Sequence, residues 1–203
     1  MAARSSLKTL LQQLTPYGAC DVADALTRLK HPYGGFLEGL RPRTKYKILG
    51  PAFPVLFELN KEKGRKPAVA GHYIDAVPKE SVLFLSAPAN LPNAVYGGIM
   101  SARLKHCFSR GHGTTAGAEL CFPSQLNVPV PLRSASQPGV VIHPGDILVG
   151  DRDGLVAIPR AMAEDVVRIL PELVETDRAC LEDVKSGRPV AETFEERRGR
   201  LRC

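Results

Sequence analysis

The stretch 140-VVIHPGDILVGDRDGLVAIP-159 decides the fold, because it alternates short apolar runs with turn sequences. The apolar runs are Val140–Ile142, Ile147–Val149 and Leu155–Ile158, and each is too short to be a helix. Between them lie Pro144-Gly145-Asp146 and an Asp-x-Asp-Gly sequence at 151–154, which both favour tight turns. The stretch therefore predicts three short strands joined by tight turns.

The chain beyond Pro159 predicts a long helix with one apolar face and an expected kink at Pro171. The residues of that face are Met162, Val166, Ile169, Leu170, Leu173 and Val174. Beyond Gly187 the sequence is highly charged, which is typical of a short terminal helix or arm. We expect residues 1–186 to form a single domain and residues 187–203 to form the charged C-terminal helix or arm.

The first half of the chain predicts a mixture of helices and strands. Ser5–Leu14 and Cys20–Leu29 have the spacing of two short helices, with Asp21 as an acid at the start of the second. Ile48–Leu59 predicts a strand, in which Gly50, Pro51 and Pro54 mark an edge, a bulge or a loop-like start. Ser81–Ala87 predicts a compact buried strand. The overall prediction is an α/β fold.

Length and composition are typical of a globular protein with one substantial core, at 203 residues and 44% hydrophobic. The apolar runs are strand-sized, far below the roughly 20 residues that a membrane helix needs, so we expect no membrane partner.

The five cysteines are scattered and form no C-x-x-C pair, which favours a reducing, cytoplasmic location. The first 20 residues hold basic and hydroxyl residues but no acid, a bias of organellar transit peptides. Mitochondrial targeting is therefore the alternative, although the leucines at 7, 10, 11 and 14 suit an ordinary first helix.

The net charge of +6 comes from three basic clusters, at 41–47, 61–66 and 197–202. Basic clusters can contact nucleic-acid phosphates. These lack interleaved aromatic residues and any known nucleic-acid-binding motif, so solvated loops and a charged tail are the simpler interpretation.

The segment Asn93–Ser101 is the best candidate for a binding site, because a Gly-Gly pair opens a helix after a strand. Free backbone amides at a helix start carry partial positive charge and can hold a carboxylate or a developing oxyanion. The alternative is that the glycines only allow a tight turn.

Three other patterns are weaker. The glycines of Arg110–Gly117 lack the spacing and the Lys-Ser/Thr of a phosphate loop. Asp151 and Asp153 could bind a metal ion, but the hairpin turn explains both. A last group has no zinc-ligand spacing: His106, Cys107, His112 and Cys121.

Five segments in collinear order resemble the RraA-like family, which includes 4-hydroxy-4-methyl-2-oxoglutarate (HMG) aldolases, oxaloacetate decarboxylases and the RNase E regulator that names the group. They are Cys20–Leu26, Ile48–Phe53, Asn93–Ser101, Leu126–Val130 and Val140–Pro159. The Gly-Gly pair resembles that of the fungal-type branch of the family. Many bacterial members have glycine followed by an acid at this position.

The resemblance implies a swivelling β/β/α domain that assembles into homotrimers or hexamers, with active sites near subunit boundaries. It implies a carbon–carbon lyase that acts on small 2-oxo acids, as a pyruvate-releasing aldolase or an oxaloacetate decarboxylase. In such aldolases the Gly-loop amides bind the pyruvate moiety, and a carboxylate holds Mg²⁺ or Mn²⁺ beside an arginine. The divalent ion and fixed donors stabilise the enolate that C–C cleavage leaves. The resemblance therefore implies that substrate is bound by Gly97, Gly98, Ile99 and Met100.

The sequence departs from the family after this loop. Family members continue with a strand ending in Gly-x-x-Arg-Asp, a helix and a short strand, whereas here Lys105-His106-Cys107 runs directly into the later segment Phe108–Gly111. No catalytic residue and no metal ligand can therefore be assigned, and a core strand and helix are expected to be missing. Either the sequence is a truncated product of an aldolase-like gene, or it is a relative that has lost catalysis and acts as a binding or regulatory subunit.

Overall fold

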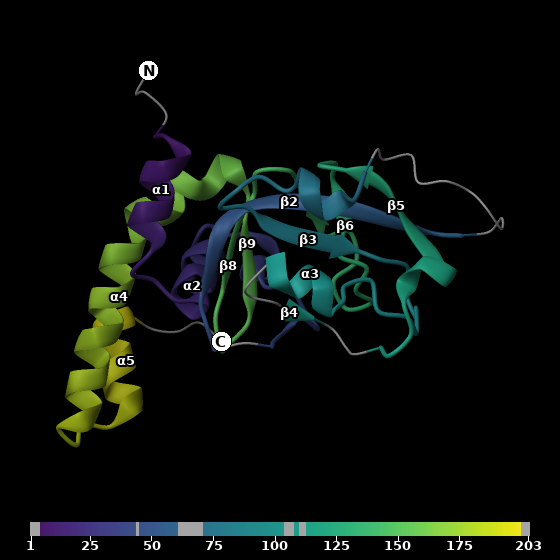
Figure 1. Cartoon of the computed structure of the whole chain (residues 1–203). Coiled ribbons are helices and arrows are strands. Elements are labelled where there is room, and N and C mark those ends of the chain that lie inside the picture. Colours follow the sequence, from purple (N-terminus) through teal and green to yellow (C-terminus); the bar gives the residue numbers. More distant parts are fainter. Residues whose placement is uncertain (1–4, 44, 61–70, 104–107, 110–112, 200–203) are drawn as a thin grey trace.

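The computed structural model describes residues 5–43, 45–60, 71–103, 108–109 and 113–199 and has the expected α/β fold. Its central feature is the long strand β2 (Ile48–Leu59), which three other strands join (Figure 1). The start of β2 pairs antiparallel with β8 (Ile147–Gly150), its middle pairs parallel with β3 (Val82–Ser86), and its end pairs antiparallel with β5 (Cys121–Leu126). Strand β9 (Leu155–Ile158) completes this five-stranded sheet beside β8.

The bounds predicted for β2 are confirmed, but the strand is central and does not lie at an edge. Its register against β5 shifts between Leu56 and Phe57, which is the bulge that the prolines suggested. Gly50 is required for a separate reason, because a Cβ atom there would lie 2.6 Å from the carbonyl oxygen of Glu80.

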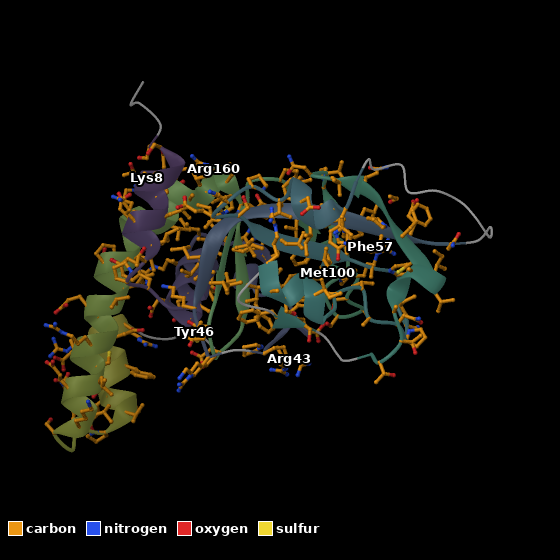
Figure 2. All side chains as sticks on the ribbon, in the orientation of Figure 1. Lys8, Arg43, Tyr46, Phe57, Met100 and Arg160 are labelled. Carbon is orange, nitrogen blue, oxygen red and sulfur yellow. The ribbon has the colours of Figure 1, made fainter. Side chains whose placement is uncertain are left out.

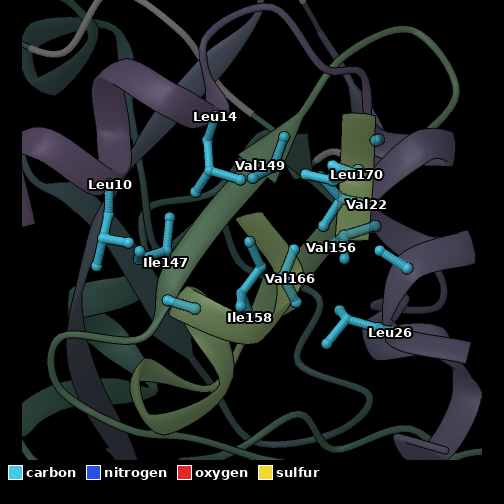
Figure 3. Close-up of a cluster of buried hydrophobic side chains, with 13 residues drawn as sticks. Leu10, Leu14, Val22, Leu26, Ile147, Val149, Val156, Ile158, Val166 and Leu170 are labelled. Carbon is cyan, nitrogen blue, oxygen red and sulfur yellow. The ribbon is translucent and has the colours of Figure 1, made fainter. Parts of the chain in front are cut away.

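Strands β8 and β9 are buried on both faces, so their alternate residues enter two different cores. Ile147, Val149, Val156 and Ile158 face the helices, in a cluster that Figure 3 shows. The intervening residues of both strands face a second core on the opposite side. Three short strands joined by turns are thus confirmed, although the first, β7 (Val141–Ile142), pairs with β6 (Val130–Pro131) in a separate sheet.

The predicted helices are confirmed within a few residues. Helices α1 (Leu7–Leu14), α2 (Ala19–Arg28) and α4 (Ala163–Lys185) pack around the first core at one end of the sheet (Figure 1). Asp21 acts at the start of α2 as expected, since its carboxylate accepts a hydrogen bond from Gly18 N at 2.7 Å. Helix α4 continues through Pro171 without ending.

The charged C-terminal segment forms helix α5 (Val190–Arg198), which folds back on α4 and projects with it from the body of the protein (Figure 1). Charged pairs join the two helices: Asp183 accepts from Arg197 Nε at 2.9 Å, and Asp177 accepts from Arg198 Nη2 at 2.5 Å. The hydrogen bond from Arg197 is the main reason that the pKa of Asp183 is lowered. Thr193 is the buried residue of α5.

The middle of the chain, from Phe108 to Pro123, has little regular structure where it is described. Strand β4 (Phe108–Ser109) pairs with β1 (Arg41–Pro42), and helix α3 (Gly98–Arg103) precedes it. Short 3₁₀ helices lie at Pro32–Gly35, Tyr73–Ala76, Gly117–Glu119 and Arg160–Met162. Most of the loop expected at 60–67 lies outside the described residues. None of the described helices is both long enough and apolar enough to cross a bilayer.

Candidate functional site: a groove beside strand β3

A groove of about 1190 Å³ lies along β3 and under the loop that leads into α3. Its apolar lining includes the half-buried Val82 from β3, together with Leu40, Ile48 and Phe108, which pack against the same core. The loop contributes a continuous stretch, from Asn93 to Tyr96. The groove is therefore an apolar surface with a polar loop at its side, which is the usual composition of a small-molecule site.

The loop 92–96 is held against a second segment by direct backbone contact. Ala94 N donates to Thr115 O at 2.9 Å, and the Asn93 amide nitrogen donates to Ala116 O at 2.7 Å. A Cβ atom at Gly113 would lie 2.7 Å from Pro92 O, and one at Gly117 would lie 2.8 Å from Ala94 O. Gly113 and Gly117 thus allow the two backbones to approach closely, which explains both glycines without a phosphate loop.

Tyr73 holds the same loop from inside the protein. Its buried hydroxyl lies 2.9 Å from Val95 O and 2.8 Å from Met100 Sδ, and it can donate its proton to either. The ring packs edge-on against Phe57 at 5.4 Å. Burial, followed by the proximity of Tyr96, raises the pKa of Tyr73 far above its usual range, so the hydroxyl stays a donor.

The four residues predicted to bind substrate lie next to the groove but not in its lining. Gly98 begins α3, and a Cβ atom there would meet nothing within 4 Å. The side chain of Ile99 is 93% exposed, while Met100 packs towards Tyr73. Gly97 accepts from Ser101 N at 3.0 Å, as the first carbonyl of the helix. Substrate binding by Gly97, Gly98, Ile99 and Met100 stays a prediction, and the residues just before them line the groove.

Two arginines line the groove that the sequence did not predict as site residues, although Arg43 belongs to the basic cluster at 41–47. Arg43 donates from Nε to Ser109 Oγ at 2.6 Å, and Arg133 donates from Nε to Ser86 Oγ at 3.3 Å. Figure 2 shows Arg43 at the lower edge of the protein in that view. The charged residues of the described lining are Arg43, Lys47, Arg133 and Glu80. Three are basic and one is acidic, so the groove carries an excess of positive charge.

Lys47 also lines the groove, but its ammonium group serves the fold. It donates to Thr15 O at 2.7 Å and also to the carbonyls of Leu14 and Tyr17. These acceptors lie at the end of helix α1 and just beyond it. Burial lowers the pKa of Lys47, although Asp151 and Asp21 oppose this. The two arginines are therefore the cations with side chains available to a ligand.

The predicted turn function of Asp151 is confirmed. Its Oδ1 accepts from Asp153 N at 3.0 Å and its Oδ2 accepts from Ala19 N at 2.7 Å. Cys121 is buried, whereas His106, Cys107 and His112 lie outside the described residues. Within the described part of the chain, no three His, Cys, Asp or Glu side chains form a group that could hold a metal ion.

This arrangement of strands and helices is the α/β fold of RraA-type proteins. Streptomyces coelicolor RraAS2, described as an unusual member of the RNase ES inhibitor RraA protein family, superposes with a TM-score of 0.70 at 20% identity over 90% of this chain and 98% of that chain. An uncharacterized protein from Pseudomonas syringae pv. tomato superposes with a TM-score of 0.78 at 22% identity, over 97% of this chain and 99% of that one. At these identities the likeness concerns the fold alone.

A sequence relative matches most of this chain, but the match covers only part of that relative. Protein DlpA of Legionella pneumophila is 26% identical over 214 residues, which cover 94% of this chain and 34% of DlpA. The chain thus spans about a third of the length of the curated relative it matches. No family model matches the sequence.

Proposed function

We propose that this chain binds small 2-oxo acids in the groove beside β3, and that it is related to the metal-dependent HMG aldolases and oxaloacetate decarboxylases of the RraA-like family. The observation that carries the proposal is the groove itself, where the loop Asn93–Tyr96 and two arginines border an apolar floor. A carboxylate is the natural partner of an arginine, since the guanidinium group can donate two parallel hydrogen bonds to it.

The lyase activity is impaired in this chain under the same proposal. Family resemblance implies Mg²⁺ or Mn²⁺, held by the aspartate of a Gly-x-x-Arg-Asp sequence that is missing here. The described donors do not fit such an ion, because Glu80 is a single carboxylate in the groove and no group of three ligands is found among the described residues. No metal-dependent step is assigned to these residues.

Calorimetric titration with pyruvate and oxaloacetate, together with an assay of pyruvate release, tests both parts. We expect binding of the acids without Mg²⁺- or Mn²⁺-dependent release of pyruvate from HMG or oxaloacetate. A chain into which a Gly-x-x-Arg-Asp segment is inserted before Phe108 is the matched comparison, and we expect it to gain metal-dependent release. A fast metal-dependent rate in the present chain would contradict the impairment, and absence of binding would contradict the proposal as a whole.

A non-catalytic binding or regulatory subunit is the second candidate, favoured by the lack of a metal-ligand group among the described residues. Such a subunit would assemble as a homotrimer or hexamer, or join the trimers of an active relative. Light scattering during size-exclusion chromatography tests the first arrangement. Mixing with an active family aldolase tests the second, with co-elution and an altered rate as the expected results.

A further inference from the structure

We infer that Arg133, oriented by Ser86, is the carboxylate-binding residue of the groove, and that the groove fits a 2-oxo acid with a branched apolar side chain. This inference rests on the proposed function and names the class of acid that the site takes.

Ser86 fixes the direction of the Arg133 side chain. Ser86 lies at the end of β3 with 4% exposure, and its hydroxyl donates to Pro131 O at 2.6 Å. With its single proton used in that bond, the hydroxyl oxygen can only accept from Arg133 Nε. The Nε–H is therefore occupied, and the two terminal nitrogens remain for a ligand. Among the described residues, no carboxylate forms an ion pair with Arg133.

The backbone at Arg133 is held in an unfavourable conformation, with a φ of 55°. Non-glycine residues rarely adopt this region, and they persist there only when their surroundings hold them. The preceding residue is fixed by a hydrogen bond from Leu132 N to Val140 O at 2.9 Å. Arg133 is one of six described non-glycine residues with a positive φ, and it lines the groove.

The loop after Arg133 is fixed as well, because it is bonded to the segment around Glu38. The hydroxyls of Ser134 and Ser136 donate to the Glu38 carboxylate, and the buried Gln137 accepts from Glu38 N at 2.9 Å and donates to Phe36 O at 2.9 Å. The backbone of Arg133 thus lies between two anchored segments, which fixes the point from which its exposed side chain extends along the groove.

The floor of the groove determines the rest of the ligand. On the face of β3 that carries Ser86, the groove is lined by the half-buried Val82, and by Leu40, Ile48 and Phe108 of the same apolar core. An acid as small as pyruvate would fill little of the 1190 Å³ and would leave this floor hydrated. Each additional buried methylene raises affinity about fourfold. A branched 2-oxo acid therefore gains affinity over these apolar side chains, where a second carboxylate would lose hydration.

Calorimetric titration with pyruvate, 4-methyl-2-oxopentanoate and the neutral ketone 4-methyl-2-pentanone tests the inference. We expect the branched acid to bind at least about tenfold more tightly than pyruvate, because it buries more apolar surface. The ketone should bind more weakly than the branched acid, because it lacks the carboxylate. Equal affinity for pyruvate and the branched acid would overturn the assignment of the ligand class while leaving the proposed function intact. Binding of neither acid would overturn both.

The variant R133G separates a binding role from a structural one. Glycine adopts a positive φ without strain, so we expect R133G to unfold at an equal or higher denaturant concentration than the wild type. Its affinity for the branched acid should fall about tenfold or more, with that for the ketone unchanged. S86A should weaken acid binding by a smaller factor, and R178Q, an exposed arginine on α4, should leave it unchanged. Unaltered acid affinity in R133G would overturn the role of Arg133.

Discussion

The carboxylate of Asp151 accepts a hydrogen bond from the backbone amide of Ala19 at 2.7 Å, so the turn between β8 and β9 caps the start of α2. The two residues are 132 positions apart. Because Asp151 also accepts from the amide of Asp153, one side chain completes a turn and a helix start together.

We expect D151A to lower the free energy of unfolding by about 1–3 kcal/mol, because two backbone amides lose their acceptor. Urea denaturation measures this loss. D153A is the matched control in the same turn, since the bond to Asp151 comes from the backbone of Asp153 and survives the change. An equal loss in both variants would contradict the capping role of Asp151.

Removal of the Tyr73 hydroxyl should loosen the loop that borders the groove. In Y73F the ring remains packed on Phe57, but Val95 O and Met100 Sδ lose their donor. We expect stability to fall by about 1 kcal/mol, and amide hydrogen exchange from Val95 to Met100 to become faster. Y33F, at an exposed tyrosine, should change neither measurement. Unchanged exchange in Y73F would show that the loop is held by other contacts.

The thiol of Cys20 should react slowly with alkylating reagents, although it is exposed. Its pKa is raised by partial burial first, and then by the charge and the hydrogen bond of Asp153. The reactive thiolate is therefore scarce near pH 8. We expect D153N to lower this pKa and to speed alkylation of Cys20, measured in a chain that carries C107S and C203S. A slower reaction in D153N would contradict this effect of the carboxylate.

His31 should make the fold less stable in mild acid. Burial lowers the pKa of His31 below its ordinary value of 6.5, and the opposing effect of Asp146 is smaller. The unfolded chain therefore binds the proton more readily than the folded one, so stability is fully present above pH 6.5 and falls as the pH drops towards the folded-state pKa. We expect H31Q to flatten the stability profile between pH 7 and about 5.5. A wild-type profile as flat as that of H31Q would contradict the shift.

The strands that the sequence predicts well are those whose pattern is local. Ile147–Gly150 and Leu155–Ile158 are apolar throughout and bounded by strong turns, which is typical of strands buried on both faces. Strand partners were harder to predict, because the pairing of Val141–Ile142 with Val130–Pro131 depends on the tertiary fold. Strand β5 was missed, since Pro123, Ser124 and Gln125 interrupt its apolar pattern.

The candidate site was predicted only in part. A loop before a Gly-Gly helix start can be recognised from sequence, and it does border the groove at Asn93–Tyr96. The pair Ser86 and Arg133 is separated by 47 residues, and it depends on a positive φ that no sequence pattern indicates. Residues that become functional through long-range contacts of this kind can be found only once the fold is known.

The attachment of α5 to α4 relies mainly on arginine–aspartate pairs, with Thr193 as the buried residue of α5. At 1 M salt the Debye length is about 3 Å, so the attraction within such exposed pairs is largely screened. Buried apolar contacts are not weakened by this screening. We therefore expect high ionic strength to loosen the contact between α5 and α4 more than it affects the sheet, whose apolar core is not screened.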